Sequence, residues 1–407
     1  MNPHVNTISN RLSLRPPQRE SLDILARVCD IIRLQKNGDP AEALKAISSE
    51  FPSVTDFERT FPSLCFALAT GVGKTRLMGA FIAWLFKARN IRHFFVLAPN
   101  LTIYNKLITD FTPNTPKYVF QGIPEFAIEQ PEIITGDNYE SGRGIRRERR
   151  RLYQADFSDV APDQFTGIGE VHINIFNISK INSEVRGGKE PRIKRLQEYI
   201  GDSYFRYLSG LDDLVLLMDE SHRYRASAGV RAINELNPIL GLELTATPQV
   251  EQGARSTPFE NVIYSYPLSS AMTDGFVKEP AVATRENFDV KNYDKQALER
   301  LKLEDGIRIH EHTKVELEVY ARENQKPLVK PFMLVVAEDT THADELMKIV
   351  EDPSFFEGRY KGKVITVHSN LRGEEKDETV AQLISVEDRS NPTEIVIHVN
   401  MLKEGWD

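Results

Sequence analysis

Short apolar runs recur along the first half of the chain, and a polar or amphipathic stretch follows each of them. Between residues 64 and 248 these runs read LCFALA, FFVLAP, VHINIFNI, LVLLMDE and LGLELTATP. Continuous apolar strands separated by helices are typical of a parallel sheet that helices cover on both faces. We therefore predict one α/β domain over residues 64–265, preceded by a helical lead-in over residues 1–63 with helical spacing at Leu22, Leu25 and Val28.

A second set of apolar runs begins near residue 331 and reads FMLVVAE, KVITVHSN and EIVIHVN. It predicts a second parallel sheet in a partial domain over residues 331–407. Between the two sets, residues 250–280 carry several chain breakers, which are typical of an interdomain connection. We expect residues 266–330 to form a linker with a charged helical segment. The breakers are Gly253, Pro258, Pro267, Gly275 and Pro280.

Composition supports this division and narrows the class of protein. The 407 residues exceed the roughly 250 to 300 at which a single core stops growing, so two domains are expected. The net charge of -8 gives no general sign of nucleic-acid binding, and a polyanion would need a locally basic groove. Cys29 and Cys65 are too few for a disulfide framework or a zinc site, which indicates a reducing cytoplasm. Because the longest apolar run, Leu77–Phe86, is about half of a bilayer-spanning length, we expect neither membrane insertion nor secretion.

The segment ATGVGKT at residues 69–75 follows a predicted strand and precedes an apolar helix, which is the context of a phosphate-binding loop. Its glycines let backbone N–H groups turn inward around a polyanion, and the helix N-terminus adds its positive end. Lys74 is expected to reach the β- and γ-phosphates, and the Thr75 hydroxyl to bind Mg²⁺. Leu68 stands where the general pattern has glycine, and the alternative is a glycine-rich turn that binds nothing. The expected nucleotide contacts in the loop are Thr70, Gly71, Val72, Gly73, Lys74 and Thr75.

Two adjacent acids, Asp219 and Glu220, follow a buried apolar strand at its carboxyl end, where open α/β sheets bind their ligands. We expect Asp219 to hold Mg²⁺, directly or through water, and Glu220 to orient or deprotonate an attacking water. The alternative is an acidic pair that caps the following helix.

Polar residues next to this pair and after the next strand extend the candidate site. His222 would sense the γ-phosphate or fill a polar position, and Arg223 and Arg225 would pair with acids or face nucleic acid. Thr245 and Thr247 of the segment TATP would couple Glu220 and His222 to movement of the second domain. In the alternative, Thr247 caps a helix that starts at Pro248.

The ordered set ATGVGKT, DESH, TATP and MLKEGWD resembles superfamily 2 helicases and translocases over nearly the whole chain. With DESHRYRA, LELTATP and LKEGWD it is most similar to the restriction (Res) subunit of type III restriction enzymes. The resemblance implies two RecA-like P-loop domains, the second incomplete, with ATP and Mg²⁺ as cofactors and DNA as a partner. It also implies that residues 112–170 are an insertion in the first domain.

The resemblance assigns further residues one by one. Gln18, after two prolines, stands where the family reads adenine, and Asp407 stands where the family contacts the nucleotide sugar. Short polar side chains and backbone N–H groups suit contacts that position a strand through its phosphates. The residues at nucleic-acid positions of the family are Asn100, Asn177, Ser179, Lys180, His368, Ser369, Asn370 and Lys403.

The sequence departs from the family pattern after Asp407, where the arginine-finger motif and the endonuclease domain would follow. We expect a truncated product that binds ATP but hydrolyses it poorly, because such a finger is worth about 10³- to 10⁵-fold in rate. The basic run Arg143–Arg151 would lie against a DNA backbone or, since Glu148 interrupts it, form a solvated helix face.

The preferred hypothesis is the ATP-driven, duplex-DNA translocase module of a restriction system, in which a separate methylation and recognition subunit reads the DNA sequence. One alternative is a DNA or RNA helicase of another defence or repair pathway. The other is a module that binds nucleic acid without turnover. A small-molecule kinase also uses GxGKT, but it has no reason to carry TATP and a second sheet.

Overall fold

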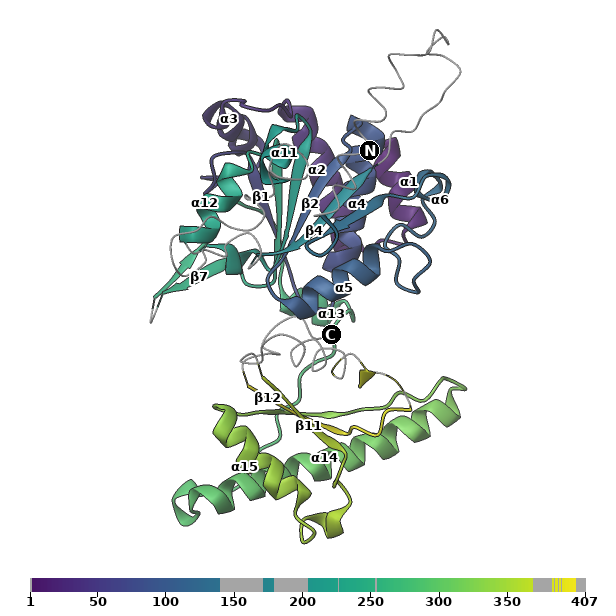
Figure 1. Ribbon diagram of the computed structural model, residues 1–407, viewed down its shortest axis with the longest axis vertical. Coiled ribbons are helices and arrows are strands. Elements are labelled where there is room, and N and C mark those ends of the chain that lie inside the picture. Colours follow the sequence, from purple (N-terminus) through teal and green to yellow (C-terminus); the bar gives the residue numbers. More distant parts are fainter. Residues whose placement is uncertain are drawn as a thin grey trace. The chain divides into compact units, whose positions relative to one another are not determined.

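The computed structural model of the protein describes residues 2–139, 171–178, 204–225, 227–252, 255–368 and 390–399, together with residues 383, 385, 386 and 388. The chain forms two compact units, Met1–Pro280 and Ala281–Asp407 (Figure 1). Each unit contains its own parallel sheet. The α/β class and the two parallel sheets expected from the apolar runs are thereby confirmed.

The first unit is built on a seven-stranded sheet in the order β3-β4-β2-β5-β6-β1-β9, and every neighbouring pair is parallel. The five apolar runs form β1, β2, β4, β5 and β6. The two edge strands, β3 and β9, were not predicted from the sequence. The bounds are β1 Ser63–Leu68, β2 His93–Ala98, β3 Glu132–Thr135, β4 His172–Asn177, β5 Leu214–Asp219, β6 Leu240–Thr245 and β9 Val262–Tyr266.

Helices cover both faces of this sheet, because alternate strand residues point to opposite sides. Phe94 and Val96 of β2 pack in one core with α1 to α6 and α13, whereas Phe95 and Leu97 pack in another with α11, η2 and α12. A short hairpin of β7 Gln249–Gln252 and β8 Arg255–Pro258 projects from the unit (Figure 1). The helices are α1 Pro3–Arg11, α2 Pro16–Ile31, α3 Pro40–Glu50, α4 Lys74–Arg89, α5 Leu101–Phe111, α6 Pro124–Ile128, α11 Tyr204–Gly210, η2 Ser221–Tyr224, α12 Ser227–Glu235 and α13 Leu268–Thr273.

Local sequence explains where the helices start and why α4 is apolar. Pro3, Pro16 and Pro40 stand in the first turns of α1, α2 and α3, where the missing N–H costs no hydrogen bond. Residues Leu77–Phe86 of α4 are buried, because this helix packs between the sheet and helices α1 and α2. In the part of the chain that the structure describes, no helix has both the length and the apolar character to cross a membrane.

The second unit holds a three-stranded parallel sheet in the order β10-β12-β11, with α14 and α15 packed on one face. Leu303 and Ile307 of α14 meet Leu346 of α15 and Ile395 and Ile397 of β12 in its core. The elements are η3 Val290–Asn292, α14 Lys295–Glu323, β10 Met333–Val336, α15 Thr340–Glu351, η4 Phe356–Gly358, β11 Val364–His368 and β12 Ile395–Val399.

Candidate nucleotide site

The expected phosphate loop connects β1 to the N-terminus of α4. Gly71 and Gly73 have φ of 77° and 96°, a region that glycine enters without steric cost. Gly73 is the N-cap of α4, so the free N–H groups of the first helical turn face the loop. Thr70, Gly71 and Gly73 are exposed, whereas Val72 is fully buried and anchors the loop in the core. This geometry suits a bound polyanion.

Helix α2 holds the loop from the side. The Gln18 amide nitrogen donates to the Gly73 carbonyl at 2.8 Å, and its amide oxygen accepts from the Arg15 backbone N–H at 2.8 Å. The Arg15 guanidinium donates to the Gly71 carbonyl at 2.7 Å and lies over the Phe276 ring. Gln18 therefore lies at the phosphate loop, with both ends of its amide engaged. The sequence pattern had no signal for Arg15, because the contact joins residues far apart in the chain.

The acidic pair lies opposite the loop. Lys74 Nζ is 2.9 Å from Glu220 Oε1, and 11% and 10% of the two side chains are exposed. Glu220 adopts φ 48° and ψ 56°, a left-handed conformation that costs energy for a residue with a side chain. Although Glu220 precedes η2, its side chain makes no capping hydrogen bond to that turn. The Glu220 side chain thus forms an ion pair with Lys74 of α4 and does not cap the turn that follows it.

Asp219 is the most perturbed group of the site. Its Oδ1 atom is buried and has no hydrogen-bond partner among the described residues. Burial and the neighbouring Glu220 charge raise the pKa of Asp219 to about 7, while Lys74 and Lys106 act against this rise. This buried carboxylate oxygen without a partner among the described residues fits the oxygen-ligand chemistry of Mg²⁺. Thr75, in the first turn of α4, would offer its hydroxyl as a further ligand.

His222 connects the end of β5 to the end of β6. Its Nδ1 atom lies 2.9 Å from Thr245 Oγ1, 3.2 Å from Thr247 Oγ1 and 3.7 Å from Glu220 Oε2. The Thr247 N–H donates to Thr245 Oγ1 at 3.1 Å. Strand β7 begins at Gln249, two residues after Thr247, so the alternative of a helix capped by Thr247 is wrong. The structure brings His222, Thr245, Thr247 and Glu220 together.

The carboxyl ends of the parallel strands gather the expected residues at one edge of the sheet. Asn177 ends β4, pairs in register with Ala98 of β2, and is buried. Asn100 follows β2 as the N-cap of α5, and its side chain accepts from the Ile103 N–H at 2.9 Å. Asn100 and Asn177 therefore share the edge that carries the phosphate loop and the acidic pair.

Other expected residues lie elsewhere. His368 ends β11 in the second unit. Arg225 pairs with acids, as one of the two alternatives had it, while Arg223 is exposed. The calls that fall outside the described residues are Ser179, Lys180, Ser369, Asn370, Lys403, Asp407 and the run Arg143–Arg151.

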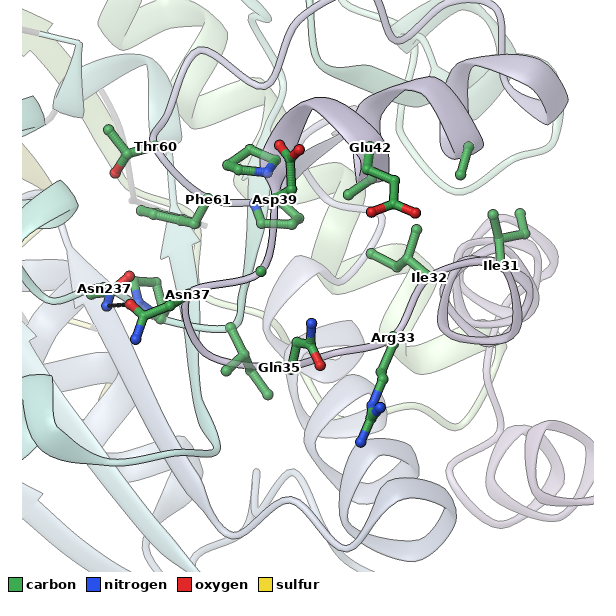
Figure 2. A pocket seen from close by; sticks show the side chains of 17 residues that line it. Ile31, Ile32, Arg33, Gln35, Asn37, Asp39, Glu42, Thr60, Phe61 and Asn237 are labelled. Carbon is green, nitrogen blue, oxygen red and sulfur yellow. Dashed lines mark hydrogen bonds between the residues drawn. The ribbon is translucent and has the colours of Figure 1, made fainter.

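A cavity of about 470 Å³ lies at the opposite edge of the same sheet. It opens between the α2–α3 connection and the residues that lead into β1 and β6 (Figure 2). Figure 2 shows the hydrogen bond from the Asn237 amide to Asn37 at its rim, 2.8 Å long. Because Thr60 and Phe61 precede β1, this cavity is at the amino ends of the strands and takes no part in the nucleotide site.

Comparison with known proteins finds a family whose model matches much of the chain. The family model "Type III restriction enzyme, res subunit" matches residues 11–250, more than half of the chain. The matched segment contains Gln18, the phosphate loop, the acidic pair and TATP. A search of curated proteins found no match.

Several solved structures align with the chain at low identity. They include a Saccharomyces cerevisiae Dbp5 variant bound to RNA and ADP BeF3, with 13% identity, 98% of this chain and 77% of that chain covered, and a TM-score of 0.40. The ATP-dependent type ISP restriction-modification enzyme LlaBIII bound to DNA has 12% identity and a TM-score of 0.49, with 97% of this chain and 25% of that chain covered. The Mycobacterium smegmatis helicase Lhr bound to ssDNA and AMP-PNP has 13% identity and a TM-score of 0.42, with 97% of this chain and 42% of that chain covered. The chain spans about a quarter of the type ISP enzyme's length.

Proposed function

The chain belongs to the Res-subunit family of type III restriction enzymes, a family of helicases and translocases, and from this premise we propose that it is an ATP-hydrolysing motor module that moves on duplex DNA. The observation that carries the proposal is that the Lys74–Glu220 ion pair and the buried Asp219 Oδ1 atom, which has no hydrogen-bond partner among the described residues, lie beside a glycine loop. These groups supply the cation, the base and the metal ligand of phosphoryl transfer to water.

The Lys74–Glu220 ion pair would be exchanged for other contacts when ATP binds. Phosphate oxygens of ATP compete with Glu220 for the Lys74 ammonium, which has three donors. As Lys74 turns to the phosphates, the Glu220 carboxylate becomes available to accept a proton from the attacking water. A magnesium ion held by Thr75 and Asp219 would neutralise charge on the phosphates.

The contacts of His222 support a role in coupling. The His222 ring contacts the hydroxyls of Thr245 and Thr247, and it lies beside Glu220. Movement of Glu220 on hydrolysis would therefore reach the end of β6. We propose that these two threonines pass the change to the second domain, and that Asn100, Asn177 and His368 contact the strand backbone. Sequence recognition would belong to a separate methylation subunit, and endonuclease activity to the larger enzyme of the family.

The test is ATP hydrolysis by the unaltered chain, Lys74→Ala and Lys87→Ala, each with no DNA, single-stranded DNA and duplex DNA. Lys87 lies on the same helix and pairs with Glu125, so Lys87→Ala is a matched loss of one ammonium group. We expect duplex-stimulated turnover that Lys74→Ala lowers about 100-fold or more and Lys87→Ala leaves intact. Stimulation by single strands alone would favour a helicase of another pathway, and nucleic-acid binding without any turnover would favour the binding module.

A further inference from the structure

A cluster of four charged side chains, three of them almost entirely buried, lies on one face of the first unit's sheet, apart from the nucleotide site. Glu243 at the centre of β6 is fully buried, and Arg59, Arg225 and Glu58 surround it. Two positive and two negative groups balance one another. Burying charged groups costs energy even when they are paired, so this cluster calls for a role.

Glu243 is the hub of the cluster. Its Oε2 atom lies 2.6 Å from Arg225 Nη2. Its Oε1 atom accepts from the Ser63 hydroxyl at 2.8 Å and from the Asn261 amide at 3.1 Å, and Arg59 Nε lies 3.5 Å away. Burial alone would raise the pKa of Glu243, but the positive charges of Arg225 and Arg59 outweigh it and lower the pKa. The carboxylate is therefore ionised throughout the neutral range.

Arg225 is held on three sides. Besides Glu243, its Nη1 atom lies 2.5 Å from Glu58 Oε2, and its guanidinium group stacks over the Phe259 ring at 3.9 Å from the centroid. The side chain is almost entirely buried. The two Nη atoms and one face of the guanidinium are therefore engaged, and the contact with Glu243 ties Arg225 to strand β6.

Arg225 directly follows the turn η2 that carries the acidic motif, and β6 contacts this turn at two points. Thr245 contacts His222, and Glu243 contacts Arg225. Residues two apart on a strand share a face and lie about 6.6 Å apart. Three residues of a 3₁₀ turn rise about 6 Å, so the two spacings match. One contact would let the turn pivot, whereas two contacts fix both ends of it.

The strained backbone of Glu220 explains why such fixing matters. Glu220 begins the turn with φ 48°, and a conformation of this kind persists only where the surroundings over-determine it. We propose that Arg225 and Glu243 are positioning residues for ATP hydrolysis, because their buried ion pair fixes the turn that places the Glu220 carboxylate and the His222 ring. This inference rests on the proposed ATPase function and assigns a role within that site.

The experiment compares the full chain with Arg225→Lys, Glu243→Gln, the double variant and Arg59→Lys. Arg59 touches Glu243 but not the turn, so Arg59→Lys disturbs the same cluster while leaving the two-point attachment. Binding of fluorescent Mg·ADP measures folding and nucleotide affinity, and kcat for ATP is determined per bound nucleotide. We expect Arg225→Lys and Glu243→Gln to lower kcat about 10- to 100-fold with nucleotide affinity nearly unchanged. Arg59→Lys should retain kcat.

The kcat of the double variant should be no lower than that of the less active single variant, because both substitutions remove the same contact between Arg225 and Glu243. Wild-type kcat in Arg225→Lys or in a folded Glu243→Gln overturns the proposal. A parallel loss of kcat and nucleotide affinity also overturns it, since this indicates a role in stability alone. If the unaltered chain shows no Lys74-dependent turnover, the proposed function itself fails and the inference falls with it.

Discussion

The surroundings of Asp219 in the folded protein disfavour the ionised form of its carboxyl group. Burial and the charge of Glu220 raise its pKa from the usual 3.8 to about 7. The folded state therefore keeps the Asp219 proton over a pH range in which the unfolded chain has lost it. Stability must then fall as pH rises from about 4 to about 7, and it reaches its lowest contribution from this group above pH 7.

Asp219→Asn removes this dependence, because an amide has nearly the same shape but does not ionise. Without Mg²⁺ at pH 8, we expect the variant to be more stable than the unaltered chain by about 1 kcal/mol or more, because it removes the buried charge. Near pH 4 the difference should vanish. Urea unfolding of both proteins across this pH range measures it, and a difference that does not change with pH would contradict the prediction.

Asp213→Asn is the matched control with the opposite sign. Burial alone would raise the pKa of Asp213, but the hydrogen bond with His93 and the charge of that ring outweigh it and lower the pKa. Ionised Asp213 therefore stabilises the fold at neutral pH, and this stabilisation is lost as pH falls below its usual range. The Asp213 variant should be the less stable protein at pH 8, where the Asp219 variant is the more stable one.

The sequence indicates residues of the candidate nucleotide site where they are neighbours in the chain. The loop at residues 69–75 and the pair Asp219–Glu220 can each be identified from the sequence, because each stands at the end of one apolar strand and consists of neighbouring residues. The bonds of Arg15 and Gln18 to the loop join segments more than 50 positions apart, and no local pattern encodes them. Glu243 did carry a signal, because a charged residue within an apolar strand needs a buried partner.

Among the structural elements, the strands of the marked apolar runs were predicted, whereas the two edge strands of the first unit's sheet were not. Strand β3 has four residues and lies within the residues expected to be an insertion, and β9 lies among the breakers of residues 250–280. The order of the strands in each sheet could not be predicted from periodicity, because periodicity does not identify which strands pair.

Helix α5 tests whether a single asparagine serves both an element and a ligand. Asn100 caps α5 through its side-chain oxygen, and the same residue is expected at the nucleic-acid strand. Asn100→Ala should destabilise the protein by about 1 kcal/mol through the lost cap. Asn100→Asp keeps an acceptor for the cap but adds a negative charge, so it should preserve stability while lowering duplex-DNA affinity several-fold.

Thermal unfolding and DNA binding at fixed salt separate the two roles. Asp39 caps α3 at the opposite edge of the sheet through its bond from the Ala41 N–H, so Asp39→Asn is a change of cap chemistry away from the expected strand. It should leave DNA affinity unchanged. Equal DNA affinity of Asn100→Asp and the unaltered chain would restrict Asn100 to its structural role.

The two compact units divide the work that the proposal assigns to the protein. Every described residue of the candidate nucleotide site lies in Met1–Pro280, including Gln18, Lys74, Asp219 and Thr247. That unit has apolar cores on both faces of its sheet, so its fold does not depend on the core of the second unit. Nucleotide binding and hydrolysis should therefore separate when the units are separated.

We expect residues 1–280 alone to bind Mg·ADP within about ten-fold of the full chain's affinity, a difference of about 1.4 kcal/mol. ATP turnover should be lost, since the proposed coupling through Thr245 and Thr247 has no second domain to act on and the sugar contact proposed for Asp407 is missing. Fluorescent-nucleotide titration and a phosphate-release assay measure the two quantities. A folded 1–280 unit that binds Mg·ADP more than about 100-fold more weakly than the full chain would contradict the prediction, because the affinity would then depend on residues beyond 280.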